Sequence, residues 1–89
     1  MEIKLMPKAE EDLAYWKAIG NVRIMKRITR LLADILEHPF TGIGKPEPLK
    51  GAQHGIWSRR ITDEHRLVYS VSNGMIFVYV LSLRFHYYK

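Results

Sequence analysis

Cysteine is absent from this chain of 89 residues. Without thiols the protein has no disulfide, no thiolate metal site and no cysteine nucleophile, which agrees with a reducing compartment. No apolar run reaches the length of a membrane span, and Glu2 and Lys4 interrupt the N-terminus where a signal peptide would need its apolar segment. We therefore expect a cytoplasmic protein that does not enter a membrane.

Acidic residues are the scarcer charged group, since 9 Asp and Glu stand against 14 Lys and Arg, a formal net charge of +5. This excess favours a polyanion, an acidic protein or both as partners, and the charge balance does not choose between them. Hydrophobic residues make up 47% of the chain, enough to bury a core. Because 89 residues leave room for one folding unit, we expect a single domain over residues 1–89.

The N-terminal part of the sequence predicts a short strand followed by a helix. Alternating side chains over residues 2–6 indicate the strand, and Pro7 has a backbone suited to the first turn of a helix. Asp12 and the acids before it favour the start of this helix, because they complement the positive end of its dipole. The helix is expected to run to about Ile19, where Gly20 ends it.

A second helix is predicted almost immediately after the first. Asn21 is a good N-cap, and apolar residues then recur at helical spacing until Pro39, which cannot continue a helix. The connection between the two helices is so short that they should form an antiparallel pair.

The C-terminal half of the sequence has the alternation of strands. Residues 56–61, 65–71 and 75–83 read as three strands with short connections, which makes them an antiparallel meander. The order is a strand, two helices and three strands, so the predicted fold class is α+β with the helix pair packed on one face of the sheet.

The length of the connection between the first two strands of the meander predicts a register that places two arginines opposite each other. If Ile61 pairs with His65 across a three-residue turn, Arg60 lies directly opposite Arg66. Two like charges opposed across a sheet repel each other, and an anion bound between them would offset this cost. The pair is therefore a candidate phosphate site.

Cleavage of RNA without a metal requires a base for the 2′-hydroxyl proton, cations for the phosphate and an acid for the leaving 5′-oxygen. Glu47 is the candidate base, because Pro46 and Pro48 stiffen the loop that holds it. His86 is the candidate acid, since the unperturbed pKa of histidine lies near neutrality. The plain alternatives are a solvated loop acid paired with Lys45 or Lys50 and a surface histidine near the C-terminus.

Cations and an aromatic residue complete this candidate site. Arg66 and Arg60 can place guanidinium forks on phosphate oxygens, Lys50 can add a point charge, and Tyr87 can stack on a nucleobase or orient the phosphate. The four histidines have no clear metal-ligand spacing, and there is no acidic cluster for a two-metal site. We therefore expect neither a metal nor another cofactor.

The second predicted helix carries a basic stripe formed by Arg23, Lys26, Arg27 and Arg30. Such a stripe is most often a solvated helix face, and the alternative is a surface that follows the phosphates of a nucleic acid. The sequence leaves both readings open.

Five segments carry a resemblance to a known family: PFTG (39–42), GKPEPLK (44–50), GIWSRRIT (55–62), EHRLVY (64–69) and RFHY (84–87). Together they closely resemble the YoeB (Txe) toxins of the RelE superfamily of bacterial toxin–antitoxin systems. The resemblance implies an α+β fold similar to small microbial ribonucleases and cleavage of messenger RNA in the ribosomal A site. It also implies neutralisation by a YefM-like acidic antitoxin, with operator DNA bound only through the toxin–antitoxin complex.

By the same resemblance, Glu47 corresponds to the general base, His86 to the general acid and Arg66 to the residue that stabilises the transition state. Lys50, Arg60 and Tyr87 correspond to substrate contacts. The chain departs from the usual family ending in having Phe85, which removes a phenol hydroxyl, and in continuing to Lys89.

A rival reading is a non-enzymatic module, either a ParE-like toxin or a DNA-binding corepressor. Such a module would need the basic surface but not Glu47 and His86 together. The sequence leaves open the codon preference, the antitoxin's identity and the oligomeric state, monomer or homodimer.

Overall fold

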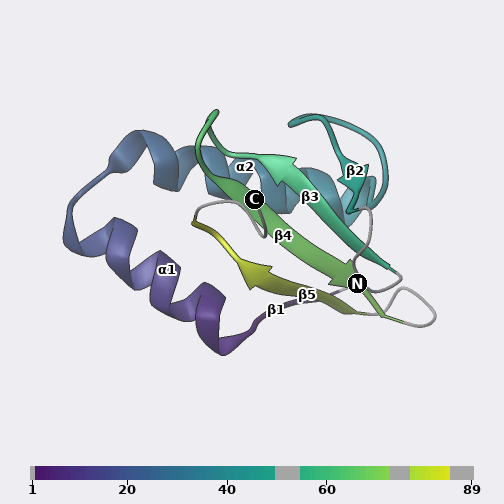
Figure 1. Cartoon of the computed structure of the whole chain (residues 1–89), viewed down its shortest axis with the longest axis horizontal. Coiled ribbons are helices and arrows are strands. Elements are labelled where there is room, and N and C mark those ends of the chain that lie inside the picture. Colours follow the sequence, from purple (N-terminus) through teal and green to yellow (C-terminus); the bar gives the residue numbers. More distant parts are fainter. Residues whose placement is uncertain (1, 50–54, 73–76, 85–89) are drawn as a thin grey trace.

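The structure is a computed structural model that describes residues 2–49, 55–72 and 77–84 (Figure 1). A strand and two helices are followed by four further strands. The elements are β1 (Glu2–Leu5), α1 (Pro7–Ala18), α2 (Val22–Glu37), β2 (Glu47–Pro48), β3 (Ile56–Arg60), β4 (Arg66–Val71) and β5 (Phe77–Ser82).

The strands form one five-stranded sheet in the order β1-β5-β4-β3-β2. The predicted antiparallel meander is confirmed by β3, β4 and β5. Two edge pairings were not predicted: β1 lies parallel to β5, and the two-residue strand β2 lies antiparallel to β3. The sheet thus brings the start of the chain beside its last strand.

Local signals set the helix boundaries close to where the sequence placed them. Pro7 occupies the first turn of α1, and Gly20 follows its end with a left-handed φ of 67°. The side-chain oxygen of Asn21 caps α2 by accepting a hydrogen bond from the amide of Ile24 at 3.1 Å. α2 ends two residues before Pro39, as expected.

The two helices run in roughly opposite directions and cover one face of the sheet (Figure 1). The core between the layers combines residues of both helices with residues of the three central strands. Its fully buried members include Ala9, Leu31, Ile35, Leu67, Tyr69 and Val80. The predicted α+β class with helices on one sheet face is confirmed. Neither helix in the described part of the chain is long and apolar enough to cross a membrane.

A bulge in the pairing of β4 with β5 changes which side chains of β5 and the residues after it face the core. Val68 pairs with Ser82 and the next residue, Tyr69, pairs with Val80, so β5 contains one extra residue at this point. Because of this bulge, Val80 and Leu83 can both enter the core, where each has no exposed surface. A regular strand would have sent them to opposite faces.

Candidate functional site

Three residues of the predicted site lie on the sheet face opposite the helices. Glu47 pairs directly with Ser58, and Arg60 pairs directly with Arg66. Residues paired across strands share a face, and so do residues two apart on one strand. Ser58 and Arg60 are two apart on β3, so Glu47, Arg60 and Arg66 share one face. The predicted register of Arg60 opposite Arg66 is confirmed.

Glu47 and Arg66 lie apart on this face. Glu47 lies two strands away from Arg66, about 10 Å, and two residues further along, about 7 Å. Within the described residues, the exposed Glu47 forms no ion pair. The backbone positions of the candidate base and the candidate cation are therefore separated and do not pair directly.

Backbone hydrogen bonds fix the segment that carries Glu47 on both sides. The carbonyl of Gly44 accepts a hydrogen bond from the amide of Arg60 at 2.7 Å, and the amide of Leu49 donates to the carbonyl of Ile56 at 3.0 Å. Gly44 has a φ of 81°, and a Cβ there would lie 2.7 Å from Cδ2 of Leu31. The approach of this segment to α2 therefore requires glycine.

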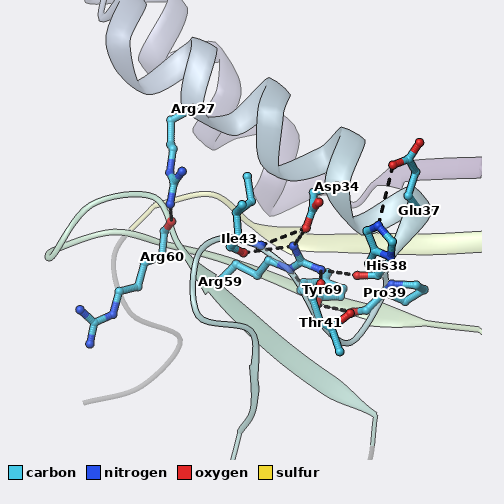
Figure 2. Close-up of polar contacts among 10 residues, drawn as sticks. All are labelled: Arg27, Asp34, Glu37, His38, Pro39, Thr41, Ile43, Arg59, Arg60 and Tyr69. Carbon is cyan, nitrogen blue, oxygen red and sulfur yellow. Dashed lines mark hydrogen bonds and ion pairs between the residues drawn. The ribbon is translucent and has the colours of Figure 1, made fainter.

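Arg59 belongs to the structural interior and takes no part in the open face. Its side chain has no exposed surface, forms an ion pair with Asp34 of α2, and donates to the backbone carbonyls of His38, Thr41 and Ile43. Figure 2 shows the side chains of Arg59 and Arg60 pointing apart, Arg59 toward α2 and Arg60 away from it. Of the two adjacent arginines, Arg60 is the one on the open face.

We call Asp34, Arg59 and Tyr69 the loop anchor, because they hold the segment after α2 against the sheet. The hydroxyl of Tyr69 donates to the carbonyl of Pro39 at 2.6 Å and accepts from Nε of Arg59 at 3.3 Å. The hydrogen bond from Arg59 holds the pKa of Asp34 below its ordinary value, and burial raises the pKa of Tyr69. At neutral pH the anchor thus keeps one carboxylate, one guanidinium and a neutral phenol.

The guanidinium of Arg66 rests on the turn between β3 and β4. Its Nη1 donates to the carbonyls of Thr62 at 2.9 Å and of Asp63 at 3.0 Å. The other terminal nitrogen, Nη2, makes no hydrogen bond in the part of the chain that the structure describes. The turn therefore holds the Arg66 guanidinium through Nη1, and the N–H groups of Nη2 can donate hydrogen bonds to a phosphate.

The basic stripe of α2 borders a groove of about 610 Å³. Its walls are the four cations of the stripe together with Asn21, Ile24, Ile61 and Thr62. Nη2 of Arg27 donates to the carbonyl of Arg60 at 3.3 Å, which links the stripe to the end of β3 (Figure 2). The groove thus reaches Thr62 in the β3–β4 turn, whose carbonyl accepts a hydrogen bond from Arg66.

The remaining predicted site residues, Lys50, His86 and Tyr87, lie outside the described residues. Within residues 2–49, 55–72 and 77–84, no three His, Asp or Glu side chains come together as a metal site would require. Sequence reasoning missed the loop anchor, although one signal was present: Asp34 is an acid among the apolar residues of α2, a pattern typical of a buried ion pair.

Solved structures with a similar fold include bacterial toxins. The YoeB/ParE toxin from Agrobacterium tumefaciens superimposes with a TM-score of 0.91 at 41% identity, covering 98% of this chain and 100% of that one. The toxin in the YoeB–YefM complex from Staphylococcus aureus gives a TM-score of 0.83 at 41% identity, covering 96% and 95% of the two chains. The fold thus places the protein among toxins of this class.

Sequence comparison narrows the class to a family. The family described as the YoeB-like toxin of bacterial type II toxin–antitoxin systems matches residues 5–87. The YoeB toxin of Mycobacterium bovis is 51% identical over 81 residues, which cover 91% of this chain and 92% of that toxin. This chain belongs to the YoeB family of type II toxin–antitoxin toxins.

Proposed function

We propose that this toxin is a ribosome-dependent endoribonuclease that cleaves messenger RNA in the ribosomal A site and so inhibits translation. The observation that carries the proposal is the shared sheet face of Glu47, Arg60 and Arg66, with a carboxylate on one side and two guanidinium groups on the other. This face offers a base and a phosphate-binding pair without any metal. Family membership supports the same function.

In the proposed reaction, the carboxylate of Glu47 takes the proton of a ribose 2′-hydroxyl, and the resulting alkoxide attacks the adjacent phosphorus. Arg66 and Arg60 stabilise the charge that develops on the phosphate oxygens. His86 gives a proton to the 5′-oxygen as the P–O bond breaks. Lys50 and Tyr87 act as substrate contacts. The products are a 2′,3′-cyclic phosphate and a 5′-hydroxyl.

Replacing the base tests the proposal directly. Glu47→Gln keeps the size of an exposed side chain but removes the proton acceptor, so cleavage of ribosome-bound message should slow by roughly 100-fold to 10,000-fold. Glu11→Gln, an exposed acid on α1, is the matched control and should cleave at the wild-type rate. A Glu47→Gln variant that cleaves like the wild type would contradict the base assignment. Undiminished growth inhibition without cleavage would favour the ParE-like alternative, a toxin that acts by binding.

The proposal includes a partner of opposite charge. In Staphylococcus aureus a YoeB toxin is found in complex with YefM. We infer that a YefM-like acidic antitoxin neutralises this chain, whose net charge is +5, by covering the face that carries Glu47 and Arg66, and that only this complex binds operator DNA. Hydrogen exchange over residues 44–49 should slow when the antitoxin binds. Full inhibition with unchanged exchange there would place the antitoxin elsewhere on the toxin.

A further inference from the structure

Two side chains of α1 hold both backbone groups of Leu83, the residue directly after β5. The carboxylate oxygen Oδ2 of Asp12 accepts a hydrogen bond from the Leu83 amide at 2.9 Å. The indole Nε1 of Trp16 donates to the Leu83 carbonyl at 3.0 Å. Both residues are buried, with 1% exposure for Asp12 and 3% for Trp16. We call this pair the α1 clamp.

The clamp supplies hydrogen-bond partners to the chain beyond the point where the edge strand β1 ends. β1 pairs with β5 up to Leu5 opposite Val80, and the amide of Met6 then donates to the carbonyl of Val80 at 2.9 Å. Pro7 turns the chain into α1, so β1 offers no partner to the chain beyond this point. Because a buried backbone group without a partner is costly, the helix satisfies the groups of Leu83 with side chains instead.

A buried carboxylate is an expensive choice for this task, which indicates a role in fixing position. Asp12 lies on the apolar face of α1, where a leucine would add to the core without the cost of desolvating a charge. Its second oxygen, Oδ1, is paired with the ammonium of Lys8 at 2.5 Å. The sequence predicts that Asp12 is one of the acids favouring the helix start, whereas in the structure its carboxylate accepts a hydrogen bond from Leu83, just after β5.

The clamp also contacts the segment that leads into Arg66. The ring of Trp16 meets the ring of His65 edge-on, with centroids 4.8 Å apart, and His65 directly precedes Arg66. On the other side, the guanidinium of Arg84 lies 3.5 Å from the centre of the Tyr15 ring. The C-terminal part of α1 thus touches both the chain entering Arg66 and the chain leaving Leu83.

We propose that Asp12 and Trp16 are positioning residues, which fix the direction in which the chain leaves Leu83 relative to Arg66. The inference deepens the proposed function and rests on it for its consequence, because His86 follows Leu83 by three residues and is the proposed general acid. Displacing a catalytic group by about 1 Å can cost roughly 100-fold in rate. The clamp therefore affects the chemical step and leaves substrate binding to other residues.

Four variants separate the clamp from the rest of the fold. Asp12→Ala removes the acceptor, Asp12→Asn keeps one, and Trp16→Phe keeps an aromatic ring but removes the donor. Glu11→Ala, the neighbouring exposed acid, is the matched control. The readouts are the single-turnover rate with saturating toxin and the concentration of half-saturation, on ribosome-bound message, after near-ultraviolet circular dichroism has confirmed the fold.

We expect Asp12→Ala and Trp16→Phe to lower the saturating rate by roughly tenfold to 100-fold with little change in half-saturation. Asp12→Asn and Glu11→Ala should stay close to the wild type. If Asp12→Ala does not fold, Trp16→Phe carries the test against Asp12→Asn. Wild-type saturating rates in every folded variant that lacks a clamp bond would overturn the proposal, and so would a loss confined to half-saturation.

A second readout does not depend on activity. Because the chain has no cysteine, spin labels can be placed uniquely at Asp63→Cys and Lys89→Cys and their separation measured by double electron–electron resonance. The distance distribution should broaden in Asp12→Ala and Trp16→Phe relative to the labelled parent, and not in Glu11→Ala. An unchanged distribution would overturn the clamp even in an active enzyme. If the wild type cleaves nothing, the proposed function fails while the distances still decide whether the clamp positions the chain.

Discussion

Asp34 of α2 and Arg59 of β3, 25 residues apart in the sequence, form an ion pair that joins the helix layer to the sheet. The guanidinium of Arg59 has no exposed surface, so its charge depends on this carboxylate and on the carbonyls around it. The pair holds the segment that leads to Glu47 in place. Arg59 therefore links the helix layer to the segment that carries Glu47.

The first prediction is that Asp34→Ala destabilises the fold strongly. Removing the carboxylate leaves a buried guanidinium without a counter-charge, which should lower the free energy of unfolding by about 3 kcal/mol. Urea denaturation followed by circular dichroism measures the change. Asp63→Ala is the control, because the ion pair of Asp63 with Arg60 is long, at 3.9 Å, and exposed, so its loss should have no measurable effect. Equal stability of the two variants would contradict the anchor's role.

The second prediction concerns the pH dependence of stability. The pKa of Asp34 in the folded state lies below its ordinary value of 3.8, so the unfolded chain binds the proton more readily. The stabilisation is complete above pH 3.8 and is lost as the pH falls further, through the lower pKa of the folded state. The wild type's advantage over Asp34→Asn in urea midpoint should thus shrink below pH 3.8. A gap that stays constant down to pH 2 would argue against this linkage.

The third prediction is that Arg66→Ala reduces cleavage by roughly 100-fold or more, because in the proposed mechanism it removes a charge that stabilises the transition state. The fold should survive, since Arg66 lies partly exposed on the open face. Arg66→Lys should recover only part of the activity, because an ammonium cannot bond the turn and fork onto a phosphate as a guanidinium does. Primer extension on ribosome-bound message measures all three proteins. Full activity of Arg66→Lys would mean that the positive charge of Arg66, and not its guanidinium geometry, is what cleavage requires.

The fourth prediction is that Lys26→Glu makes the fold more stable. Lys26 lies three residues after Arg23 and four before Arg30, near the start of α2, so it meets like charges and the positive end of the helix dipole. Reversing its charge should raise the free energy of unfolding by about 0.5 to 1 kcal/mol, seen as a higher melting temperature. Lys17→Glu, in the last turn of α1, should have the opposite sign.

The same variant distinguishes the two readings of the basic stripe. If the stripe follows phosphates, Lys26→Glu should weaken binding to ribosomes, and the loss should grow smaller as salt is added. If the stripe is a solvated surface, ribosome binding should match that of the wild type at every salt concentration. Sedimentation of the toxin with ribosomes measures the difference.

The fifth prediction concerns products and metal dependence. Attack by the 2′-hydroxyl should leave a cyclic phosphate, or the 3′-phosphate derived from it, on one fragment and a 5′-hydroxyl on the other. A chelator should leave the rate unchanged once ribosome integrity is controlled. A 5′-phosphate on the product would show that external water or a metal-bound nucleophile attacks, and would refute the mechanism.

The sequence by itself determined those features that depend on neighbouring residues. Pro7, Gly20, Asn21 and Pro39 set the helix boundaries, because each acts on the backbone within one turn of its own position. The opposition of Arg60 and Arg66 followed from the length of one turn, since a turn fixes the register of the strands that it joins.

Only the tertiary structure decided that Arg59, the neighbour of the predicted site residue Arg60, is a buried partner of α2. Alternation along β3 places Arg59 and Arg60 on opposite faces of the sheet. Which group Arg59 contacts depends on the packing of α2, which brings Asp34 against it. Neighbouring residues also could not predict the parallel pairing of β1 with β5 or the hydrogen bond between Asp12 and Leu83. These features join residues that are far apart in the chain. The packing of the whole core decides which of them meet, and a buried polar or charged group is costly unless it has a partner there.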